Sequence, residues 1–429
     1  MTAAQAPPRP EPTPPREPIS APRTPVTARL RPSGSRLGPL PVLNLVVGEI
    51  GLTLGLALIT LDTALWAAAL IVLVIAVPLA LGRWHGQWLV QWVQLAARYL
   101  VRSHGRSVPG HGSPAAGTAS SPADDPRVAL LRLLLPDLTI VPSADRQREP
   151  LGLAWHHGTW TAVLEVDAAA SMITPVGSTA GLPLGALAAC LDDRGVALDA
   201  IQVIWHCYPG SAALPSTSPA LRSYLEVLGP LPAAARRTTW IAVRLDPRRC
   251  PAAVAERGGG VIGCHRALIG ALSRVRATLE SRGVSTRPLD ADQLVRAGIC
   301  AAELSAVAGT GQPVALNERW TAVTAGGVGH ASYAIAGWGA TGAVHNLNAL
   351  TGVRALSTTV ALSISPGDST GTEVGLSGLV RLSARNPAEL ESADGQLRTV
   401  AQRLGVALRP LGGLQAAGLT ATLPLGAPG

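Results

Sequence analysis

The chain has 429 residues, of which 47% are apolar, and a formal net charge of +8. This length and apolar content supply a core for about two or three domain-sized units and exclude a wholly disordered polypeptide. All 35 basic residues are arginine, so lysine Schiff-base catalysis, the P-loop lysine and the kinase lysine are excluded together.

The excess positive charge lies in two segments on either side of the most apolar stretch. Residues 1–42 hold six arginines against two acids, and residues 83–106 hold four arginines and no acid. The remainder of the chain is balanced. A nucleic-acid footprint should lie on the folded body, so this placement argues against nucleic acid and favours a lipid bilayer as a partner.

The first 42 residues are dense in proline and arginine and show no hydrophobic period. We predict that residues 1–42 form a disordered cytoplasmic tail.

Residues 43–82 predict a transmembrane helical hairpin. Two apolar runs, 43–60 and 64–81, would each give about 27 Å of helix, close to the roughly 30 Å of a hydrocarbon core. The alternatives are a helical hairpin buried in a globular domain and a cleaved signal peptide, which fits less well because a second apolar run follows the first. Arginine flanks both outer ends and the turn holds only Asp62, so both termini are expected in the cytoplasm.

Glu49 is the one ionisable residue within a predicted span. A charge at the centre of an isolated helix would cost about 2.5–3.5 kcal/mol on insertion scales. Two interpretations remain: Glu49 lies close enough to the headgroups to be hydrated, or it contacts a helix of another subunit.

Residues 83–103 predict an amphipathic helix at the membrane interface, because tryptophan recurs at helical spacing opposite a stripe of glutamine and arginine. Its expected interface residues are Arg83, Trp84, Trp88, Trp92, Arg98, Tyr99 and Arg102. The alternative is that the aromatic stripe packs on a partner protein. Residues 104–126, rich in Gly, Ser, Pro and Ala, predict a linker.

Residues 127–425 predict a cytosolic α/β or α+β domain with a mixed sheet and helices, divided into two lobes near 310–330. Short β-favouring runs occur at 133–142, 151–156, 160–167, 201–206, 239–245, 357–364 and 372–384. Helical runs occur at 184–194, 251–257, 261–282, 290–306 and 387–404. No internal repeat at a fixed period is found.

Motifs with chemical potential favour plain structural interpretations. The five cysteines form no CxxC pair, and His156-His157 lacks any further ligand at metal spacing. Gly258, Gly260 and Gly263 match GxGxxG, but the preceding PAAVAER favours a helix where a strand is required. Asp290-Ala-Asp292 matches the DxD pair of glycosyltransferases, yet Gln293 also makes it a helix-capping box. We therefore predict no catalytic residue, cofactor or metal.

Several stretches in order resemble the EccE family, a membrane subunit of type VII (ESX) secretion systems of high-GC Gram-positive bacteria. They include GRWHGQWLVQWVQLAARYLVR, LGLAWHHGTWTAVLEVD, TTWIAVRLDPRRCPAAVAERGGG and RATLESRGVSTRPLDADQL. The resemblance covers about residues 40–425.

The resemblance implies a non-enzymatic subunit of the inner-membrane secretion complex, assembled with EccB, EccD and the ATPase EccC. It also implies a peripheral cytosolic domain whose fold is similar to a degenerate glycosyltransferase. Two other classes stay open at this point: a membrane-anchored glycosyltransferase-like enzyme, and a generic membrane-tethered scaffold.

Overall fold

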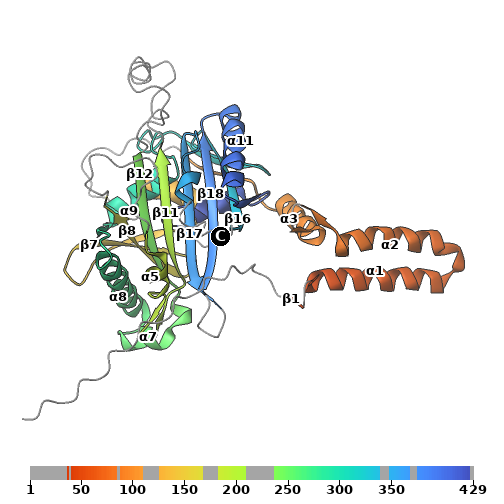
Figure 1. The fold of residues 1–429 in the computed structure, drawn as a ribbon, viewed down its shortest axis with the longest axis horizontal. Coiled ribbons are helices and arrows are strands. Elements are labelled where there is room, and N and C mark those ends of the chain that lie inside the picture. The colour runs from red at the N-terminus through yellow and green to blue at the C-terminus, as the bar shows by residue number, and fades with distance from the viewer. Residues whose placement is uncertain are drawn as a thin grey trace, which may run out of the picture.

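The protein consists of a helical arm and a body built on one large sheet (Figure 1). The structure is a computed structural model. It describes residues 36–37, 40–84, 87–109, 125–167, 182–208, 236–338, 347–367 and 374–425. Most of the predicted tail and most of the predicted linker lie outside the described residues.

The arm is a pair of antiparallel helices, α1 (Val42–Leu61) and α2 (Trp66–Leu81), that lie side by side (Figure 1). It follows two short paired strands, β1 (Arg36–Leu37) and β2 (Leu40–Pro41). Among the described residues, α1 is the one helix that is long and apolar enough to cross a membrane, while α2 is apolar but has only 16 residues.

The second apolar run is shorter as a helix than its predicted span of 64–81. Asp62 accepts a hydrogen bond from the Ala64 backbone N–H at 2.8 Å, which winds Thr63–Leu65 into a 3-10 turn, η1, before α2 begins. Glycines of α1 face alanines of α2, and a Cβ on Gly51 would clash with the Cβ of Ala76. Small residues thus bring the two backbones together, as is common between membrane helices.

After α2, the chain turns through β3 (Arg83–Trp84) and β4 (Gln87–Trp88) into α3 (Leu89–Val101). The predicted interfacial helix therefore begins six residues later than expected, because Gly82 closes a tight turn by accepting a hydrogen bond from Leu89 N–H at 3.0 Å. The predicted linker is also wrong at its start. Residues Gly105–Val108 form β5, which joins the body's sheet.

All pairings among the described strands are antiparallel, so the mixed sheet of the sequence analysis is corrected to an antiparallel sheet in an α+β body. Two of its connections are nevertheless helical crossovers between strands that run parallel without pairing. α8 leads from β12 to β13 on the two edges of β8, and α11 leads from β18 to β19 on the two edges of β16. The strand order is β5-β14-β15-β16-β18-β17-β11-β12-β8-β7-β6, with β13 beside β8 and β19 beside β16.

The strands in chain order are β6 (Thr139–Ala144), β7 (Pro150–His156), β8 (Thr159–Val166), β11 (Ala200–Tyr208), β12 (Arg236–Leu245), β13 (Thr286–Pro288), β14 (Val314–Glu318), β15 (Val323–Ala325), β16 (Val328–Gly337), β17 (Ser357–Pro366), β18 (Val374–Ala384) and β19 (Ala407–Pro410). A separate small pair is β9 (Asp192–Asp193) and β10 (Val196–Ala197).

Helices cover both faces of the sheet and enclose two hydrophobic cores. One face carries α5 (Leu184–Ala188), α8 (Gly260–Glu280), α10 (Leu347–Leu350) and α11 (Pro387–Arg403), and the other carries α4 (Pro126–Leu134), α9 (Ala291–Ala301) and α12 (Gln415–Ala421). The short η3 (Pro247–Arg249) and α7 (Pro251–Glu256) lead into α8. Neighbouring strand residues alternate between the cores, so Val203 belongs to the first and Ile204 to the second.

Two halves of the body repeat one topology. The first half has strand order β6-β7-β8-β12-β11 and continues with α8, β13 and α9. The second has order β14-β15-β16-β18-β17 and continues with α11, β19 and α12. Moreover, β13 returns to pair with β8 just as β19 returns to β16.

The strand registers place a local two-fold axis at the centre of the sheet. The hairpin turns His157-Gly158 and Gly326-Gly327 are equivalent and have positive φ throughout. Residues of β8 and β16 that lie equally far from these two turns correspond to each other. Following their strand partners through β12 and β18 into β11 and β17 makes Ile204 correspond to Ala361. Those two residues are themselves partners in the β11–β17 ladder, so the axis passes between them.

A short sequence repeat marks the same correspondence. GVSTRPL at 283–289 and GVALRPL at 405–411 each run from the end of a long helix into a returning strand. Gly283 and Gly405 have φ of +77° and +67°, the left-handed conformation that terminates a helix.

The leucine that closes each copy also makes an equivalent bond. Leu289 N–H donates to the Val163 carbonyl at 3.0 Å, and Leu411 N–H donates to the Ser332 carbonyl at 2.9 Å. Val163 and Ser332 occupy matching places in β8 and β16. The repeat is therefore real, but it is confined to a segment too short to show a fixed period in the sequence.

Most predicted elements of the body agree with the structure. Two differ. The strand predicted at 133–142 is wrong in its first half, because α4 runs to Leu134 and β6 begins only at Thr139. The helix predicted at 184–194 ends at Ala188, and Asp192–Asp193 forms β9. Asp125 caps α4 through Arg127 N–H, and Pro126 occupies its first position. The division into two lobes near 310–330 falls close to the boundary between the repeated halves, which lies between α9 and β14.

Candidate functional site

The arm joins the body at an aromatic cluster on α3. The Trp92 ring stacks on Trp320 with centroids 5.5 Å apart, and Tyr99 meets the same indole edge-on at 5.2 Å. Residues seven apart lie on one face of a helix, so both rings point toward the body. Trp320 lies in the loop between β14 and β15.

Polar contacts close the same junction. The Arg102 guanidinium lies 2.7 Å from Glu318 Oε1 and donates to the Gly413 carbonyl at 2.6 Å. Glu318 Oε1 also accepts from Ala416 N–H at 3.0 Å, in the first turn of α12. α3, the end of β14 and the start of α12 thus share one buried carboxylate.

Gly413 allows this close approach. Its φ is +69°, and a Cβ there would lie 2.7 Å from the Trp320 ring. Any other residue at position 413 would be strained and would displace the indole that holds α3.

The expected interface residues divide between two places. Trp92, Tyr99 and Arg102 contact the body, whereas Arg83 stacks on Trp88 at the root of the arm, with its guanidinium carbon 4.0 Å from the ring centroid. Arg98 is exposed on α3. The side chain of Trp84 lies outside the described residues. Sequence reasoning missed Trp320, Glu318 and Gly413, since their sequence positions carry no signal that links them to residues 92–102.

In the arm, Glu49 lies exposed on α1, away from the contact with α2. The polar residue between the helices is Asn44, whose side-chain amide donates to the Ala80 carbonyl at 2.7 Å. Ala80 lies in the last turn of α2, so this bond satisfies a carbonyl that has no partner within its own helix.

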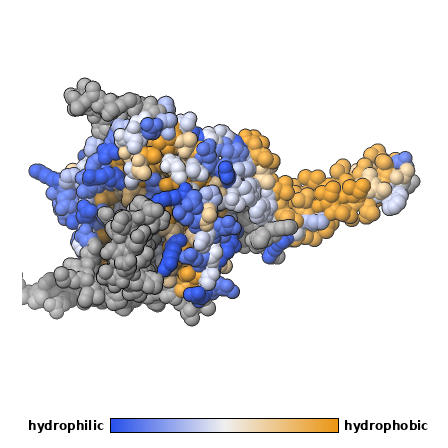
Figure 2. Space-filling model, turned by 90° about the horizontal axis from the view of Figure 1, so that it is seen from above, coloured by the Kyte–Doolittle hydropathy of each residue, from blue (hydrophilic) through white to orange (hydrophobic). Residues whose placement is uncertain are grey.

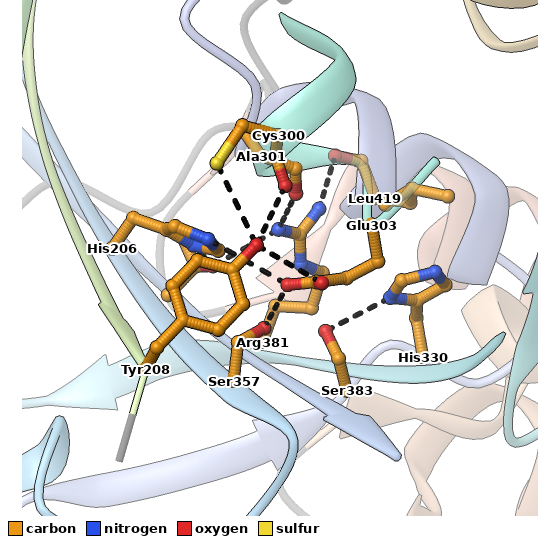
Figure 3. A network of polar contacts seen from close by, with 11 residues as sticks. His206, Tyr208, Cys300, Ala301, Glu303, His330, Ser357, Arg381, Ser383 and Leu419 are labelled. Atoms are coloured by element: carbon orange, nitrogen blue, oxygen red, sulfur yellow. Dashed lines mark hydrogen bonds and ion pairs between the residues drawn. The ribbon is translucent and has the colours of Figure 1, made fainter. Parts of the chain in front are cut away.

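A second polar cluster is buried in the body, against the face covered by α9 and α12 (Figure 3). Arg381 of β18 is fully buried. Its guanidinium donates to the carbonyls of Ala301 and Leu419 and to the Thr359 hydroxyl. This one side chain fastens the ends of two helices to the sheet.

Glu303 completes the cluster from the turn after α9, with φ of +58°. Its carboxylate accepts hydrogen bonds from the hydroxyls of Ser357 and Tyr208. Burial raises the pKa of Glu303, opposed by these hydrogen bonds and by Arg381. Burial beside Glu303 likewise raises the pKa of Tyr208.

His206 is held neutral within the same cluster. Burial and the positive Arg381 lower its pKa to about 3, although Nε2 lies 3.6 Å from Glu303 Oε1. The desolvation of a fully buried imidazolium outweighs that one attraction. Its Nδ1 shares a hydrogen bond with the Thr359 hydroxyl at 2.8 Å. The stability of the body therefore depends on the protonation state of this cluster.

The glycines and histidines singled out in the sequence have structural roles here. Helix α7 precedes Gly258, and Gly258, Gly259 and Gly260 all have positive φ, which gives a helix-breaking turn. His157 occupies the β7–β8 turn. The part of the chain that the structure describes contains no group of three residues arranged to hold a metal, and its five cysteines are free.

The DxD pair is used as a helix cap and an ion-pair site. Asp290 accepts from Gln293 N–H at 2.7 Å while the Gln293 side chain accepts from Asp290 N–H at 3.1 Å, which confirms the capping box. Asp292 pairs with Arg127 at 2.7 Å and with Arg296 at 2.9 Å. Both carboxylates are thus occupied.

Residues 233–335 match the EccE family model, which describes a type VII ESX secretion system translocon. The chain is 30% identical over 166 residues to the ESX-5 secretion system protein EccE5 of Mycobacterium marinum, covering 36% of this chain and 40% of that protein. It is 40% identical over 73 residues to the ESX-1 secretion system protein EccE1 of Mycolicibacterium smegmatis, covering 17% and 16%. These matches span less than half of either relative.

Proposed function

We propose, from the premise that this chain belongs to the EccE family of type VII (ESX) secretion proteins, that it is a non-catalytic structural subunit of the inner-membrane secretion complex. In this proposal it contributes to the assembly or stability of the export machinery. Its partners would be EccB, EccD, the ATPase EccC and the lipid bilayer.

One observation carries the proposal beyond family membership: the apolar arm is fastened to the body. Trp320 and Glu318 of the body hold the aromatic and basic residues of α3, directly beside the end of α2. Such a junction fixes a cytosolic domain relative to its membrane anchor, as a structural subunit requires. The occupied Asp290 and Asp292 give no support to a glycosyltransferase-like activity.

We propose that both arm helices span the membrane with both termini cytoplasmic. The hairpin pairing, the apolar exposed surface and the flanking arginines support this orientation (Figure 2). A reporter fused at residue 429 should be active in the cytoplasm. Protection of that reporter from protease added to inverted vesicles would contradict the topology.

Affinity purification from mild detergent tests the assembly role. We expect the full chain to recover an EccC-type ATPase together with other membrane subunits. Recovery of the chain as a clean monomer would overturn the proposal. As a matched comparison, Trp320→Ala removes the indole that holds α3 against the body and should reduce the recovery of partner subunits. The exposed Arg106→Gln should leave that recovery unchanged.

Glu49 is proposed to contact a helix of another subunit, because it is exposed on the arm and turned away from α2. Glu49→Leu should reduce the recovery of partner subunits without releasing the chain from membranes, and Glu49→Gln should retain more of it. The control is Leu56→Ala, which removes an exposed apolar side chain from the same helix. Full recovery with Glu49→Leu would exclude this contact.

A further inference from the structure

Helix α3 has two apolar faces, and the body covers only one. Trp92 and Tyr99 lie against Trp320. The outer stripe, which we define as Val93, Ala97 and Leu100, is exposed. The exposed fractions are 54% for Val93 and 78% for Leu100.

Helical geometry makes the outer stripe a continuous surface. Each residue advances by about 100°, so Val93, Ala97 and Leu100 lie beside one another, next to the face that holds Trp92. The glutamines and Arg98 occupy the remaining arc. The apolar surface of α3 is therefore wider than the part of it that contacts the body.

The position of α3 indicates what covers the outer stripe. Leu89, its first residue, donates to the Gly82 carbonyl at 3.0 Å, and Gly82 ends α2. A Cβ on Gly82 would clash with the Leu89 side chain, so the two helices meet without intervening space. In Figure 2 the hydrophobic surface of the arm is followed by a further hydrophobic area where the arm meets the body.

The charges around the stripe are those that anionic headgroups attract. Residues 83–106 contain four arginines and no acid. Arg102 is neutralised by Glu318 of the body, whereas Arg83, Arg98 and Arg106 are exposed. An exposed apolar stripe flanked by unopposed cations is typical of a helix that lies in a bilayer surface.

We propose that lipid of the membrane that holds the arm contacts the outer stripe, while the body retains Trp92 and Tyr99. The inference rests on the membrane role proposed for the arm. α3 is thus fixed on two sides, by the body through its aromatic rings and by the bilayer through Val93, Ala97 and Leu100. It holds the body at a set orientation against the membrane surface.

The test places a photocrosslinking amino acid, p-benzoylphenylalanine, at single positions of the full chain in native membranes. The positions are Leu100 and Val93 on the outer stripe, Gln94 on the polar arc and Leu54 on the arm. Phospholipids carry an alkyne-tagged acyl chain, so a lipid adduct can be counted directly. We expect several-fold more lipid adduct at Leu100 and Val93 than at Gln94.

Two results would overturn the inference: equal lipid adduct at Leu100 and Gln94, or adducts to another protein alone, which would assign the stripe to a partner subunit. Leu54, whose side chain is 50% exposed, separates this failure from that of the proposed function. Lipid adduct at Leu54 without any at Leu100 overturns only the stripe, whereas its absence at Leu54 overturns the membrane hairpin.

An independent variant guards against effects of the bulky crosslinker. Leu100→Cys and Gln94→Cys, labelled with a polarity-sensitive fluorophore, are reconstituted as full chains in phosphatidylglycerol and phosphatidylethanolamine vesicles. The unsubstituted chain supplies the background from its five native cysteines. Brominated acyl chains should quench the label at position 100 several-fold more than at 94, and equal quenching would overturn the proposal.

Discussion

Arg102 and Glu318 form an ion pair between the arm and the body, with 2.7 Å between the guanidinium Nη2 and Oε1. The two residues are far apart in sequence and belong to different units of the structure, α3 and β14. The Glu318 side chain is only 5% exposed, so this pair is largely shielded from water on the body side. Among the described residues, this ion pair joins the end of α3 to the sheet.

We predict that Arg102→Gln loosens the junction. Among the described residues, the Glu318 carboxylate then keeps one hydrogen-bond donor, the Ala416 N–H. A charge left partly unpaired costs about 1–3 kcal/mol, and less here because the Arg102 side chain is 36% exposed. The free energy of unfolding should fall by roughly 1 kcal/mol. Trypsin should cleave α3 after Arg98 faster than in the unsubstituted chain.

Two further variants separate the ion pair from general effects. Arg106→Gln removes an exposed arginine on the neighbouring strand and should change neither measurement. Arg102→Gln combined with Glu318→Gln should recover part of the stability, because no charge is then left buried. An unchanged cleavage rate in Arg102→Gln would show that the pair does not hold α3.

We predict that Gly51→Leu separates the helices of the arm. A Cβ at position 51 already clashes with Ala76, and a larger side chain forces the backbones apart. The readout is a disulfide between Gly48→Cys and Ala80→Cys, since the Cβ atoms at 48 and 80 would lie 3.5 Å apart. The disulfide should form readily in the parent and poorly with Gly51→Leu.

The exposed Leu56→Phe is the control for added volume on the same helix. It should leave the disulfide yield unchanged. Equal yields in Gly51→Leu and Leu56→Phe would mean that the glycine face does not set the distance between α1 and α2.

The sequence was sufficient to predict elements whose signal is local. Helix 261–282 has an apolar stripe and a terminating glycine, and the Asp290–Gln293 capping box is readable as a motif; both are confirmed. The strand direction was not readable, because helices cover both faces of this antiparallel sheet. Its strands are buried on both faces and so have the continuous apolar runs that are typical of parallel strands.

The junction and the internal repeat required tertiary structure. Nothing in the neighbourhood of Trp320 indicates that Trp92 stacks on it, since the contact depends on the path of the whole second half. The repeat could have been found from GVSTRPL and GVALRPL, which share glycine, valine and Arg-Pro-Leu at matching positions. Outside these two segments, the two halves correspond through strand order and register, which the sequence does not show.

Two helical glycines should respond oppositely to alanine. A Cβ at Gly298 in α9 would lie 2.7 Å from Leu425 and 3.1 Å from Leu131, both in the core, whereas a Cβ at Gly395 in α11 meets open space. Gly298→Ala should lower the free energy of unfolding by about 1–2 kcal/mol through overpacking. Gly395→Ala should raise it by about 0.5–1 kcal/mol, since alanine favours the helix.

Chemical denaturation of the two variants measures both effects in the same background. Gly395→Ala serves as the control for helix propensity alone. Stabilisation by Gly298→Ala would contradict the close packing of α9 against α4 and the C-terminal segment.

Acid should destabilise the body through His206. Its pKa is about 3 in the folded protein against an ordinary 6.5, so the unfolded chain binds an extra proton between these values. Stability contributed by the neutral His206 is present above pH 6.5 and is lost as the pH falls toward 3, by up to about 5 kcal/mol for a shift of this size. Glu303 acts in the opposite sense, because its raised pKa makes the folded state hold a proton as the pH rises above 4.5.

His206→Asn can keep the bond to Thr359. In this variant the free energy of unfolding should therefore fall less between pH 6.5 and 4 than in the parent chain. Denaturant unfolding at a series of pH values measures this slope, with the exposed His157→Asn as the matched control. If the two variants have the same slope as the parent, His206 does not carry the acid sensitivity of the body.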